Sequence, residues 1–268
     1  MRHSLVREEE LPALRQLLRA AGAAILVHFG AATPSRYKAD ASPVTAADLA
    51  AQEVLAAGLK ERWPTRALVS EEAEAPPALR SGDPFWLIDP LDGTKEFLAG
   101  NGEFTVNLAL IAEGRAILGL VYAPALDLLY WGGSTLGAFC EQGGKVRAIA
   151  TTQPHRPLRV VASKSHLNDT TAAFIDQLGE VTLIQAGSSL KFCRIAEGAA
   201  DCYPRLAPTY EWDTAAAQAV LEGAGGQVLD LTGKPLRYGK PAWRNAGFVA
   251  WGTPPAQTLF PSILLPRR

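Results

Sequence analysis

The 268-residue sequence predicts a layered α/β fold, because three patterns follow one another along the chain. Apolar residues recur at helical spacing between residues 11 and 25, and a second helical stretch covers residues 45–62. Compact apolar runs separated by turn residues then occupy residues 85–131, as in an antiparallel sheet. After about residue 150, short strands alternate with helices. Helices and sheets in this order bury their apolar faces by packing in layers.

The first half of the chain is expected to form two helices and most of one sheet. Gly30 and then Pro34 are expected to end the first helix, and Trp63-Pro64 closes the second. Residues 73–84 are rich in Ala and Pro and are interpreted as a surface loop. The expected strands are a short one ending at Val69 and the runs 86–88, 104–111, 116–123 and 128–131.

The second half alternates between the two kinds of element, and the sequence contains no internal repeat, heptad or low-complexity tract. The expected strands are residues 158–162, 181–184, 202–204 and 227–230. The expected helices are residues 170–178, 189–197 and 213–223.

Composition and charge exclude several classes of protein. Hydrophobic residues make up 48% of the chain and charged residues 20%, which argues against a disordered tail, a fibre or a disulfide scaffold. The formal net charge is −1, so there is no general basic field to attract nucleic acid. An anionic substrate must therefore be bound locally, by metals, helix ends or a few placed cations.

Cysteine usage and the absence of an export signal indicate a cytoplasmic protein. Cys140, Cys193 and Cys202 have no C-x-x-C spacing and cannot all pair with one another, so a reducing compartment is expected. We expect all three to be small, buried apolar residues. The first ten residues turn acidic where a signal peptide needs an apolar core, and the apolar stretch 20–32 is too short to span a bilayer. Peripheral attachment to the inner membrane and the oligomeric state are left open.

The most informative feature is an apolar strand at residues 86–88 that runs directly into Asp89-Pro90-Leu91-Asp92-Gly93-Thr94. Pro90 fixes φ and removes an N–H donor, so the Leu91 carbonyl can point outwards. Carboxylates and a carbonyl are the oxygen ligands that hard divalent cations prefer. Gly93 allows a sharp turn, and Thr94 opens a helix whose free N–H groups can bind phosphate. On turn chemistry alone, the run is also compatible with a capped turn.

Three further acids stand at the ends of other elements. Glu71, in Ser70-Glu71-Glu72, follows a strand end, where a carboxylate pair is costly without a compensating cation. Asp213 precedes an expected helix, where Asp is also an ordinary N-cap. Asp48 lies in the first turn of the second helix, where a solvated acid is also favourable. Together these acids predict a two-metal phosphatase site, which activates water and needs no His or Cys nucleophile.

Four motifs resemble, in order and spacing, those of the inositol monophosphatase superfamily. They are Pro-Val-Thr-Ala-Ala-Asp (43–48), Ser-Glu-Glu (70–72), Asp-Pro-Leu-Asp-Gly-Thr (89–94) and Trp-Asp-Thr-Ala-Ala (212–216). The runs Asn-Gly-Glu-Phe-Thr-Val-Asn (101–107) and Gly-Ser-Ser-Leu-Lys-Phe-Cys (187–193) resemble its bisphosphate nucleotidase branch. The resemblance runs from near residue 5 to about residue 250, and it implies alternating layers of helices and sheets, αβαβα.

The resemblance implies a role for each matching residue. One Mg²⁺ would be held by Glu71, Asp89 and the Leu91 carbonyl, and a second by Asp89, Asp92 and Asp213. Asp48 and Thr94 would form a hydrogen-bonded pair that orients and deprotonates the attacking water. Gly93 and Thr94 would present backbone N–H groups to the scissile phosphate. Residues 1–150 would thus form a metal-binding region and residues 151–268 a substrate-selecting region, closely packed as one catalytic unit.

Substrate contacts are expected from the second half of the chain. The resemblance implies that the nucleotide is contacted by Ser163, His166, Gly187 and Lys191. Ser188 is added as part of a helix start, and Arg205, after Tyr203-Pro204, could join Lys191 around a second phosphate. The N–H groups at 187–189 open an expected helix and could bind an anion or a ribose oxygen. The alternatives are that His166 caps its loop, that Lys191 snorkels along the helix and that Arg205 forms a surface ion pair.

The implied activity is removal of the 3′-phosphate from adenosine 3′,5′-bisphosphate, leaving AMP, with the 5′-phosphosulfate form as a further substrate. The resemblance also implies a place in sulfate assimilation and inhibition by Li⁺ at the second metal position. Two alternatives are open at this point: an inositol monophosphatase or broad sugar phosphatase, and a non-catalytic nucleotide-binding regulator that keeps the fold.

Overall fold

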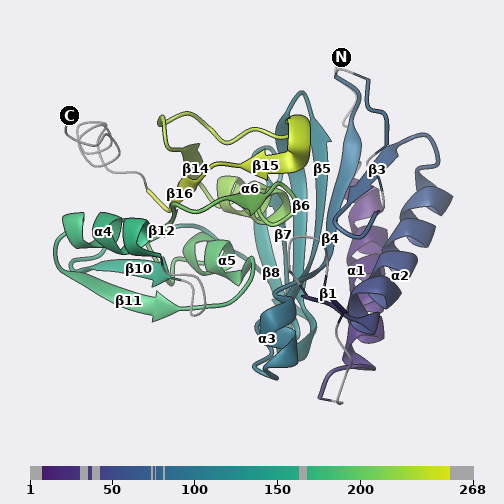
Figure 1. Ribbon diagram of the computed structural model, residues 1–268, viewed down its shortest axis with the longest axis horizontal. Coiled ribbons are helices and arrows are strands. Elements are labelled where there is room, and N and C mark those ends of the chain that lie inside the picture. The colour runs from purple at the N-terminus through teal and green to yellow at the C-terminus, as the bar shows by residue number, and fades with distance from the viewer. Residues whose placement is uncertain are drawn as a thin grey trace.

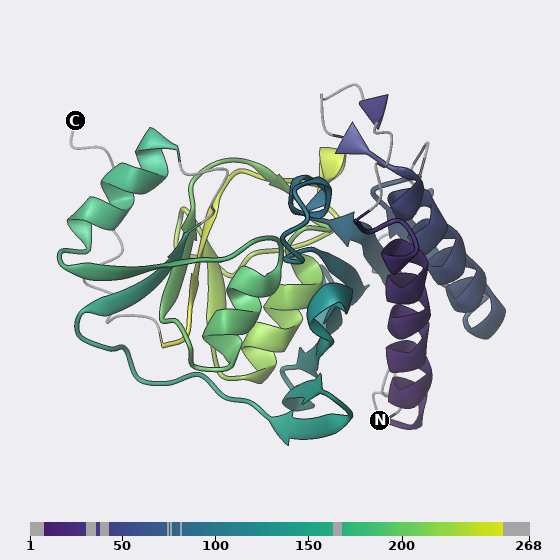
Figure 2. The same cartoon turned by 90° about the horizontal axis from the view of Figure 1, so that it is seen from below.

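The computed structural model describes residues 8–30, 36–37, 43–73, 75, 77–80, 82–162 and 168–253. These residues form five layers in the order helices, sheet, helices, sheet, helix (Figure 1 and Figure 2). Helices α1 (Leu11–Leu26) and α2 (Ala46–Arg62) form the first layer, and α4 (Asp169–Gln177) forms the last. Helices α5 (Leu190–Ala196) and α6 (Ala215–Gly223) lie between the two sheets. The αβαβα arrangement expected from the sequence is confirmed.

The larger sheet has seven strands in sequence order, β3 to β9. Only β3 and β4 are parallel, and every other neighbouring pair is antiparallel. The strands are Ala67–Ser70, Phe85–Asp92, Thr105–Ala112, Arg115–Ala123, Leu128–Gly133, Gly137–Gln142 and Lys145–Ala148. A short helix, α3 (Thr94–Leu98), follows β4 directly.

The smaller sheet has five strands in the order β11-β10-β12-β16-β14. Strand β10 runs parallel to both of its neighbours, and β16 runs antiparallel to both of its own. The strands, in that order, are Val181–Gln185, Leu158–Ala162, Cys202–Arg205, Phe248–Trp251 and Gln227–Asp230. Two small two-stranded sheets pair β1 (Arg36–Tyr37) with β2 (Pro43–Val44), and β13 (Thr209–Tyr210) with β15 (Arg244–Asn245). Short 3₁₀ helices occupy Glu8–Glu10, Pro124–Leu126 and Pro241–Trp243.

Both faces of the larger sheet are covered, which explains why its central strands are mostly apolar. Along β4, Trp86 and Ile88 face the layer of α1 and α2, whereas Phe85 and Leu87 belong to the core on the opposite side. This alternation follows from the two-residue period of a strand. A sheet buried on both faces gives continuous apolar runs instead of alternating polar and apolar residues.

Helix α6 packs against the larger sheet at very short range, because glycine occupies the contact position. A Cβ atom at Gly119 in β6 would lie 1.9 Å from the carbonyl oxygen of Ala216. A Cβ atom at Gly223, at the other end of α6, would lie 2.4 Å from the carbonyl oxygen of Gly137. Glycine therefore lets the backbone of α6 approach the backbone of the sheet closely. This contact fixes the position of α6 and of the residues that precede it.

Several predicted elements differ from the observed ones. Strands β8, β9 and β16 were not predicted, and α1 ends at Leu26 before the expected stop at Gly30; Pro34 lies outside the described residues. Helix α6 begins at Ala215, two residues after the expected start at Asp213. The expectation for the cysteines is confirmed, since all three are free and buried. No helix among the described residues is long and apolar enough to cross a membrane.

The division into residues 1–150 and 151–268 stays a prediction. Each of the two large sheets comes from one side of that boundary. Helix α6, however, comes from the second part and packs on β6 and β7 of the first.

Candidate active site

Four of the predicted acids interact at the end of β4. Asp89 is 1% exposed, and burial raises the pKa of its carboxyl group well above the usual range. The charges of Glu71, Asp92 and Asp213 raise this pKa further, as does a hydrogen bond between Asp89 and Glu71. Residues from three separate segments are therefore close enough to repel one another. The predicted convergence of these acids is present in the structure.

Asp213 has the same kind of environment. Burial raises the pKa of its carboxyl group, and the charges of Asp92 and Glu71 add to this effect. The Tyr210 N–H donates to Asp213 Oδ2 over 2.8 Å and opposes it. The residue in the N-cap position of α6 is Thr214, so Asp213 does not serve as the cap. Its carboxylate faces the other acids instead.

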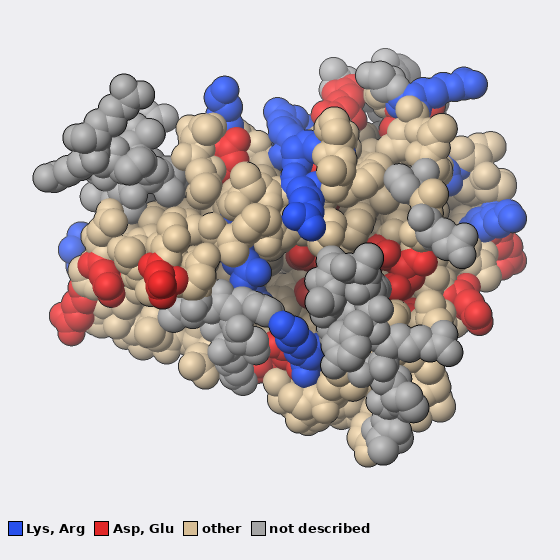
Figure 3. Space-filling view, in the orientation of Figure 1, with Lys and Arg blue, Asp and Glu red and all other residues tan. Residues whose placement is uncertain are grey.

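The chemistry of these side chains fits a divalent cation. Hard oxygen donors grouped in a buried position carry a desolvation and repulsion cost that bound Mg²⁺ would offset. Within the described part of the chain, no group of three or more His, Cys, Asp or Glu side chains is placed so that it could hold a metal ion as it stands. The argument for a metal therefore depends on the kind of side chain gathered here, which is four carboxylates, and not on an already formed ligand geometry. Figure 3 shows acidic and basic side chains near one another in the middle of one face.

The backbone of residues 89–94 is shaped by local contacts. The Leu91 N–H donates to Asp89 Oδ1 over 3.0 Å, and the register of β4 against β5 shifts between Asp89 and Asp92. Gly93 then has a φ of 91°, a left-handed conformation that favours glycine, and α3 starts at Thr94. The predicted turn into a helix is thus confirmed. The Leu91 carbonyl oxygen lies 3.4 Å from the Thr94 hydroxyl.

Asp48 joins this group from α2. Its Oδ2 accepts hydrogen bonds from the backbone N–H and the hydroxyl of Thr45, each at 2.7 Å, in a capping box. Its Oδ1 lies 3.3 Å from the Thr94 hydroxyl. Asp48 is 1% exposed, so it is not a solvated first-turn acid. The Asp48–Thr94 contact expected from the sequence is present.

Sequence reasoning missed the polar residues that surround Asp92. Its Oδ2 lies 2.7 Å from the hydroxyl of Ser189, 3.4 Å from Nδ2 of Asn107 and 3.5 Å from the hydroxyl of Thr105. Asn107 and Thr105 both belong to β5, where every residue is buried. The signal available in the sequence was a polar pair inside an otherwise apolar strand.

Lys191 and Arg205 lie close enough to each other and to the acids for their charges to interact. Lys191 is 7% exposed, and burial lowers the pKa of its ammonium group despite the nearby charges of Asp92, Glu96 and Glu103. Its Nζ lies 5.4 Å from the ring centre of Tyr203. Arg205 is close enough to lower the pKa of both Lys191 and Asp213. A lysine buried in this way does not snorkel to solvent.

One N–H group of the 187–189 segment is already hydrogen-bonded. The Gly187 N–H donates to Glu103 Oε2 over 3.0 Å, so it already has a partner in this structure, and its contact with substrate stays a prediction. A side chain at Gly187 would also collide with Glu96 and Glu103. Ser188 has a φ of 44°, and its buried hydroxyl has no hydrogen-bond partner among the described residues. Ser163 and His166 lie outside the described residues.

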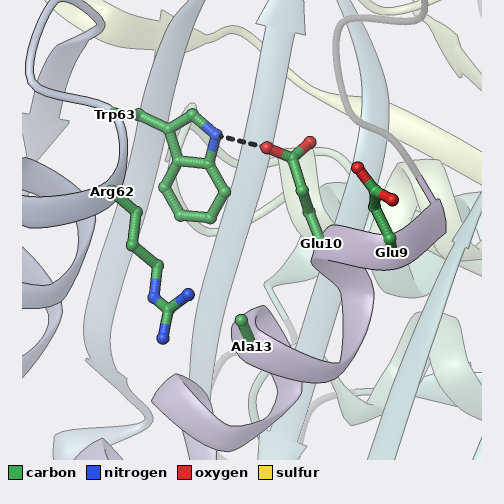
Figure 4. Close-up of a pocket in the computed structure, with 5 residues that line it drawn as sticks. All are labelled: Glu9, Glu10, Ala13, Arg62 and Trp63. Carbon is green, nitrogen blue, oxygen red and sulfur yellow. Dashed lines mark hydrogen bonds between the residues drawn. The ribbon is translucent and has the colours of Figure 1, made fainter.

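A separate surface pocket of about 390 Å³ lies between the start of α1 and the end of α2. It is lined by Glu9, Glu10, Ala13, Arg62 and Trp63 (Figure 4). The indole N–H of Trp63 donates to Glu10 Oε1 over 3.0 Å. The pocket contains none of the acids described above, so it is not the candidate active site.

Comparison with known proteins agrees with this geometry. A model of the inositol monophosphatase family matches residues 7–256. The chain is 46% identical over 239 residues to the 3′(2′),5′-bisphosphate nucleotidase CysQ of Salmonella typhimurium, and the match covers 87% of this chain and 96% of that protein. The crystal structure of CysQ from Bacteroides thetaiotaomicron has a TM-score of 0.82 at 36% identity and covers 92% of this chain and 98% of its own. The IMPase of Thermotoga maritima has a TM-score of 0.76 at 26% identity, with 91% and 92% covered.

Proposed function

The chain belongs to the inositol monophosphatase family, and we propose that it is a Mg²⁺-dependent 3′(2′),5′-bisphosphate nucleotidase. Its substrate would be adenosine 3′,5′-bisphosphate, which it would hydrolyse to AMP and phosphate. The observation that carries this proposal is the group of buried acids around Asp89, in a chain that is 46% identical to a nucleotidase of this kind.

The oxygen ligands for two Mg²⁺ ions would come from both halves of the chain. Glu71, Asp89 and the Leu91 carbonyl would hold one ion, and Asp89, Asp92 and Asp213 would hold the other. When bound, the ions would activate water near neutral pH and stabilise charge on the phosphate and on the leaving oxygen. The raised pKa values of Asp89 and Asp213 support this assignment, because a bound cation would offset the burial and mutual repulsion that raise them.

The protein groups would orient the water and the phosphate. The Asp48 carboxylate, linked to the Thr94 hydroxyl at 3.3 Å, would accept the proton of the attacking water. Backbone N–H groups of Gly93 and Thr94 would bind oxygens of the scissile phosphate at the start of α3. The water would displace the leaving oxygen directly, in line, and no phosphoenzyme would form.

Selectivity for a bisphosphate would come from a second anion site. The buried ammonium of Lys191, with Arg205 nearby, would bind the 5′-phosphate, and the hydroxyl of Ser188 would donate to the nucleotide. Ser163 and His166 would add further contacts. Among the described residues Lys191 forms no ion pair with a carboxylate, and a buried lysine of this kind favours a substrate that carries two anionic groups over inositol phosphate. The 5′-phosphosulfate analogue has the same charge at this end and would also be accepted, and Li⁺ would inhibit.

Product analysis tests this assignment. Purified protein with Mg²⁺ is incubated with adenosine 3′,5′-bisphosphate, and the products are identified by ³¹P NMR and chromatography. We expect inorganic phosphate and adenosine 5′-phosphate. Adenosine 3′-phosphate as product would reverse the assigned orientation of the substrate. Tight binding of the nucleotide without turnover would instead indicate a nucleotide-binding regulator.

A further inference from the structure

A hydrogen-bond relay ends on Asp92, and none of the roles proposed above uses it. Asn107 Nδ2 donates to the Ser189 Oγ over 2.8 Å, and this Oγ lies 2.7 Å from Asp92 Oδ2. Because the amide hydrogen occupies a lone pair of the hydroxyl oxygen, the hydroxyl's own hydrogen is free to point at the carboxylate. The hydroxyl has one hydrogen and two acceptors in reach, Asp92 Oδ2 at 2.7 Å and the Asp213 carbonyl at 3.0 Å, and the shorter contact with the charged acceptor is favoured. The relay therefore runs from Asn107 through Ser189 to Asp92.

We propose that Ser189 and Asn107 are positioning residues that hold Asp92 in the orientation required of a metal ligand. This proposal rests on the proposed function, in which Asp92 binds the second Mg²⁺. Oδ2 of Asp92 accepts the Ser189 hydroxyl and weaker contacts from Asn107 and Thr105 at 3.4 and 3.5 Å. Oδ1 takes none of these bonds and is left available as a metal ligand, and the charge of Asp92 is close enough to raise the pKa of Asp89 and of Asp213. Such outer contacts commonly set both the orientation and the affinity of metal ligands.

The burial of the two residues supports this role. Asn107 and Ser189 are each 1% exposed, and Oδ1 of Asn107 has no hydrogen-bond partner among the described residues. An amide with an unpaired oxygen lowers the stability of an apolar strand, and an apolar residue would avoid that loss. Turning the amide over would bring its oxygen against the Asp92 carboxylate, which is repulsive. The contribution of Asn107 is therefore the hydrogen bond that its Nδ2 donates to Ser189.

Ser189 also connects the metal ligands with the substrate-binding segment. Its Oγ lies 3.0 Å from the backbone carbonyl of Asp213, the other predicted ligand of the second ion. In sequence it stands between Ser188 and Lys191, the residues proposed to contact the nucleotide. One hydroxyl from the second half of the chain thus contacts two metal-binding residues, one in each half.

Metal affinity tests the proposal in the full-length chain. Ser189→Ala removes only the hydroxyl, and Mn²⁺ binding to the metal-free protein is measured by calorimetry alongside the Mg²⁺ half-saturation of phosphate release. We expect the affinity for one ion to fall by about 10–100-fold. The KM for adenosine 3′,5′-bisphosphate at saturating Mg²⁺ changes little. Unchanged metal affinity and unchanged half-saturation would overturn the proposal.

The matched control is Thr171→Val, which removes a buried hydroxyl from α4 in the outer layer. That hydroxyl accepts a hydrogen bond from the Leu206 N–H over 3.2 Å and lies away from the acids. We expect Thr171→Val to bind metal like the wild type, even where its unfolding temperature falls as much as that of Ser189→Ala. Equal losses of metal affinity in both variants would mean that Ser189 acts only through stability.

The order of the relay is tested by Asn107→Leu, alone and together with Ser189→Ala, or by Asn107→Ala if the leucine prevents folding. If Asn107 acts through Ser189, the double variant loses no more metal affinity than Ser189→Ala alone. Fully additive losses would contradict the relay. If the wild type binds Mn²⁺ more tightly than Ser189→Ala but releases no phosphate from the nucleotide, the positioning role holds and the proposed function fails.

Discussion

The hydroxyl of Thr94 lies 3.3 Å from Oδ1 of Asp48, although the two residues are 46 positions apart in the sequence. Asp48 can make this contact because its other oxygen is fixed by the capping box at the start of α2. Thr94 can make it because the left-handed Gly93 directs the chain into α3. Two helix starts therefore meet at one carboxylate, beside the predicted metal ligands.

This contact predicts a loss of turnover when either side chain is changed. Asp48→Asn and Thr94→Val should each lower kcat by about 10²–10⁴-fold, because they remove the group that accepts the proton of water or the hydroxyl that orients it. The Mg²⁺ half-saturation should stay within a few-fold of wild type, as measured by steady-state phosphate release. Thr94→Ser keeps the hydroxyl and should retain most of the activity. Wild-type kcat in Asp48→Asn would exclude Asp48 as the base.

Removal of the Asp89 charge should abolish activity and stabilise the metal-free protein. In the folded state the pKa of Asp89 is raised, so the folded state keeps this proton to higher pH than the unfolded chain, whose Asp pKa is about 3.9. The contribution of Asp89 to the free energy of unfolding therefore falls as pH rises from about 4 through the raised pKa. Asn in its place removes this penalty.

Urea unfolding in EDTA checks this prediction at about pH 5 and about pH 8. The free energy of unfolding of Asp89→Asn, relative to wild type, should be larger at the higher pH. Excess Mg²⁺ should stabilise the wild type more than the variant, because binding to the folded state alone raises its stability. A variant that is less stable than the wild type by the same amount at both pH values would contradict the assigned charge repulsion.

The second anion site predicts a substrate-dependent effect of Lys191→Met. A charge-assisted hydrogen bond is worth about 1.5–3 kcal/mol, so KM for adenosine 3′,5′-bisphosphate should rise by about 10–100-fold. Adenosine 3′-phosphate lacks the 5′-phosphate, and its kcat/KM should change little. Lys145→Met, on the exposed strand β9, is the matched control and should leave both substrates unaffected. An equal loss for both nucleotides would place Lys191 at the scissile phosphate.

The close packing of α6 predicts that Gly119→Ala weakens both stability and catalysis. The added methyl group would meet the carbonyl of Ala216, which is backbone and cannot rotate away. Overpacking of this kind costs about 1–3 kcal/mol of unfolding free energy. Since Asp213 immediately precedes α6, displacement of the helix should also raise the Mg²⁺ half-saturation. Thermal unfolding and Mg²⁺ titration of the variant measure the two effects, and wild-type values of both would show that α6 is not constrained there.

Much of the fold could be predicted, because most elements carry local signals. The helix at Ala46–Arg62 has a capping residue, and β4 to β7 are apolar runs separated by turns. Strand β16 could not be placed from such signals. Its four residues, Phe248–Trp251, are buried and do not alternate between apolar and polar. They pair with β12, which lies far earlier in the chain, and with β14, which is separated from β16 by β15. Pairing of this kind depends on tertiary packing.

The candidate site divides in the same way. Asp48 and Asp213 could be identified because each stands at the start of a helix, and Asp89 because it follows an apolar run, although β4 continues past the expected end to Asp92. The contact of Gly187 with Glu103 could not be predicted, because it joins two loops that only the layered packing brings together. The relay through Ser189 was missed for the same reason, since hydroxyl and amide groups are common in sequences and gain a role only from their neighbours.

The measurement that tests the central claim most directly is phosphate release from adenosine 3′,5′-bisphosphate and from inositol 1-phosphate, each with Mg²⁺, with EDTA and with added Li⁺. We expect a kcat/KM strongly in favour of the nucleotide, activity abolished by EDTA and inhibition by Li⁺. Preference for inositol 1-phosphate would retain the metal site and contradict the role of Lys191 and Arg205. Full activity on the nucleotide in EDTA would contradict the metal-dependent mechanism itself.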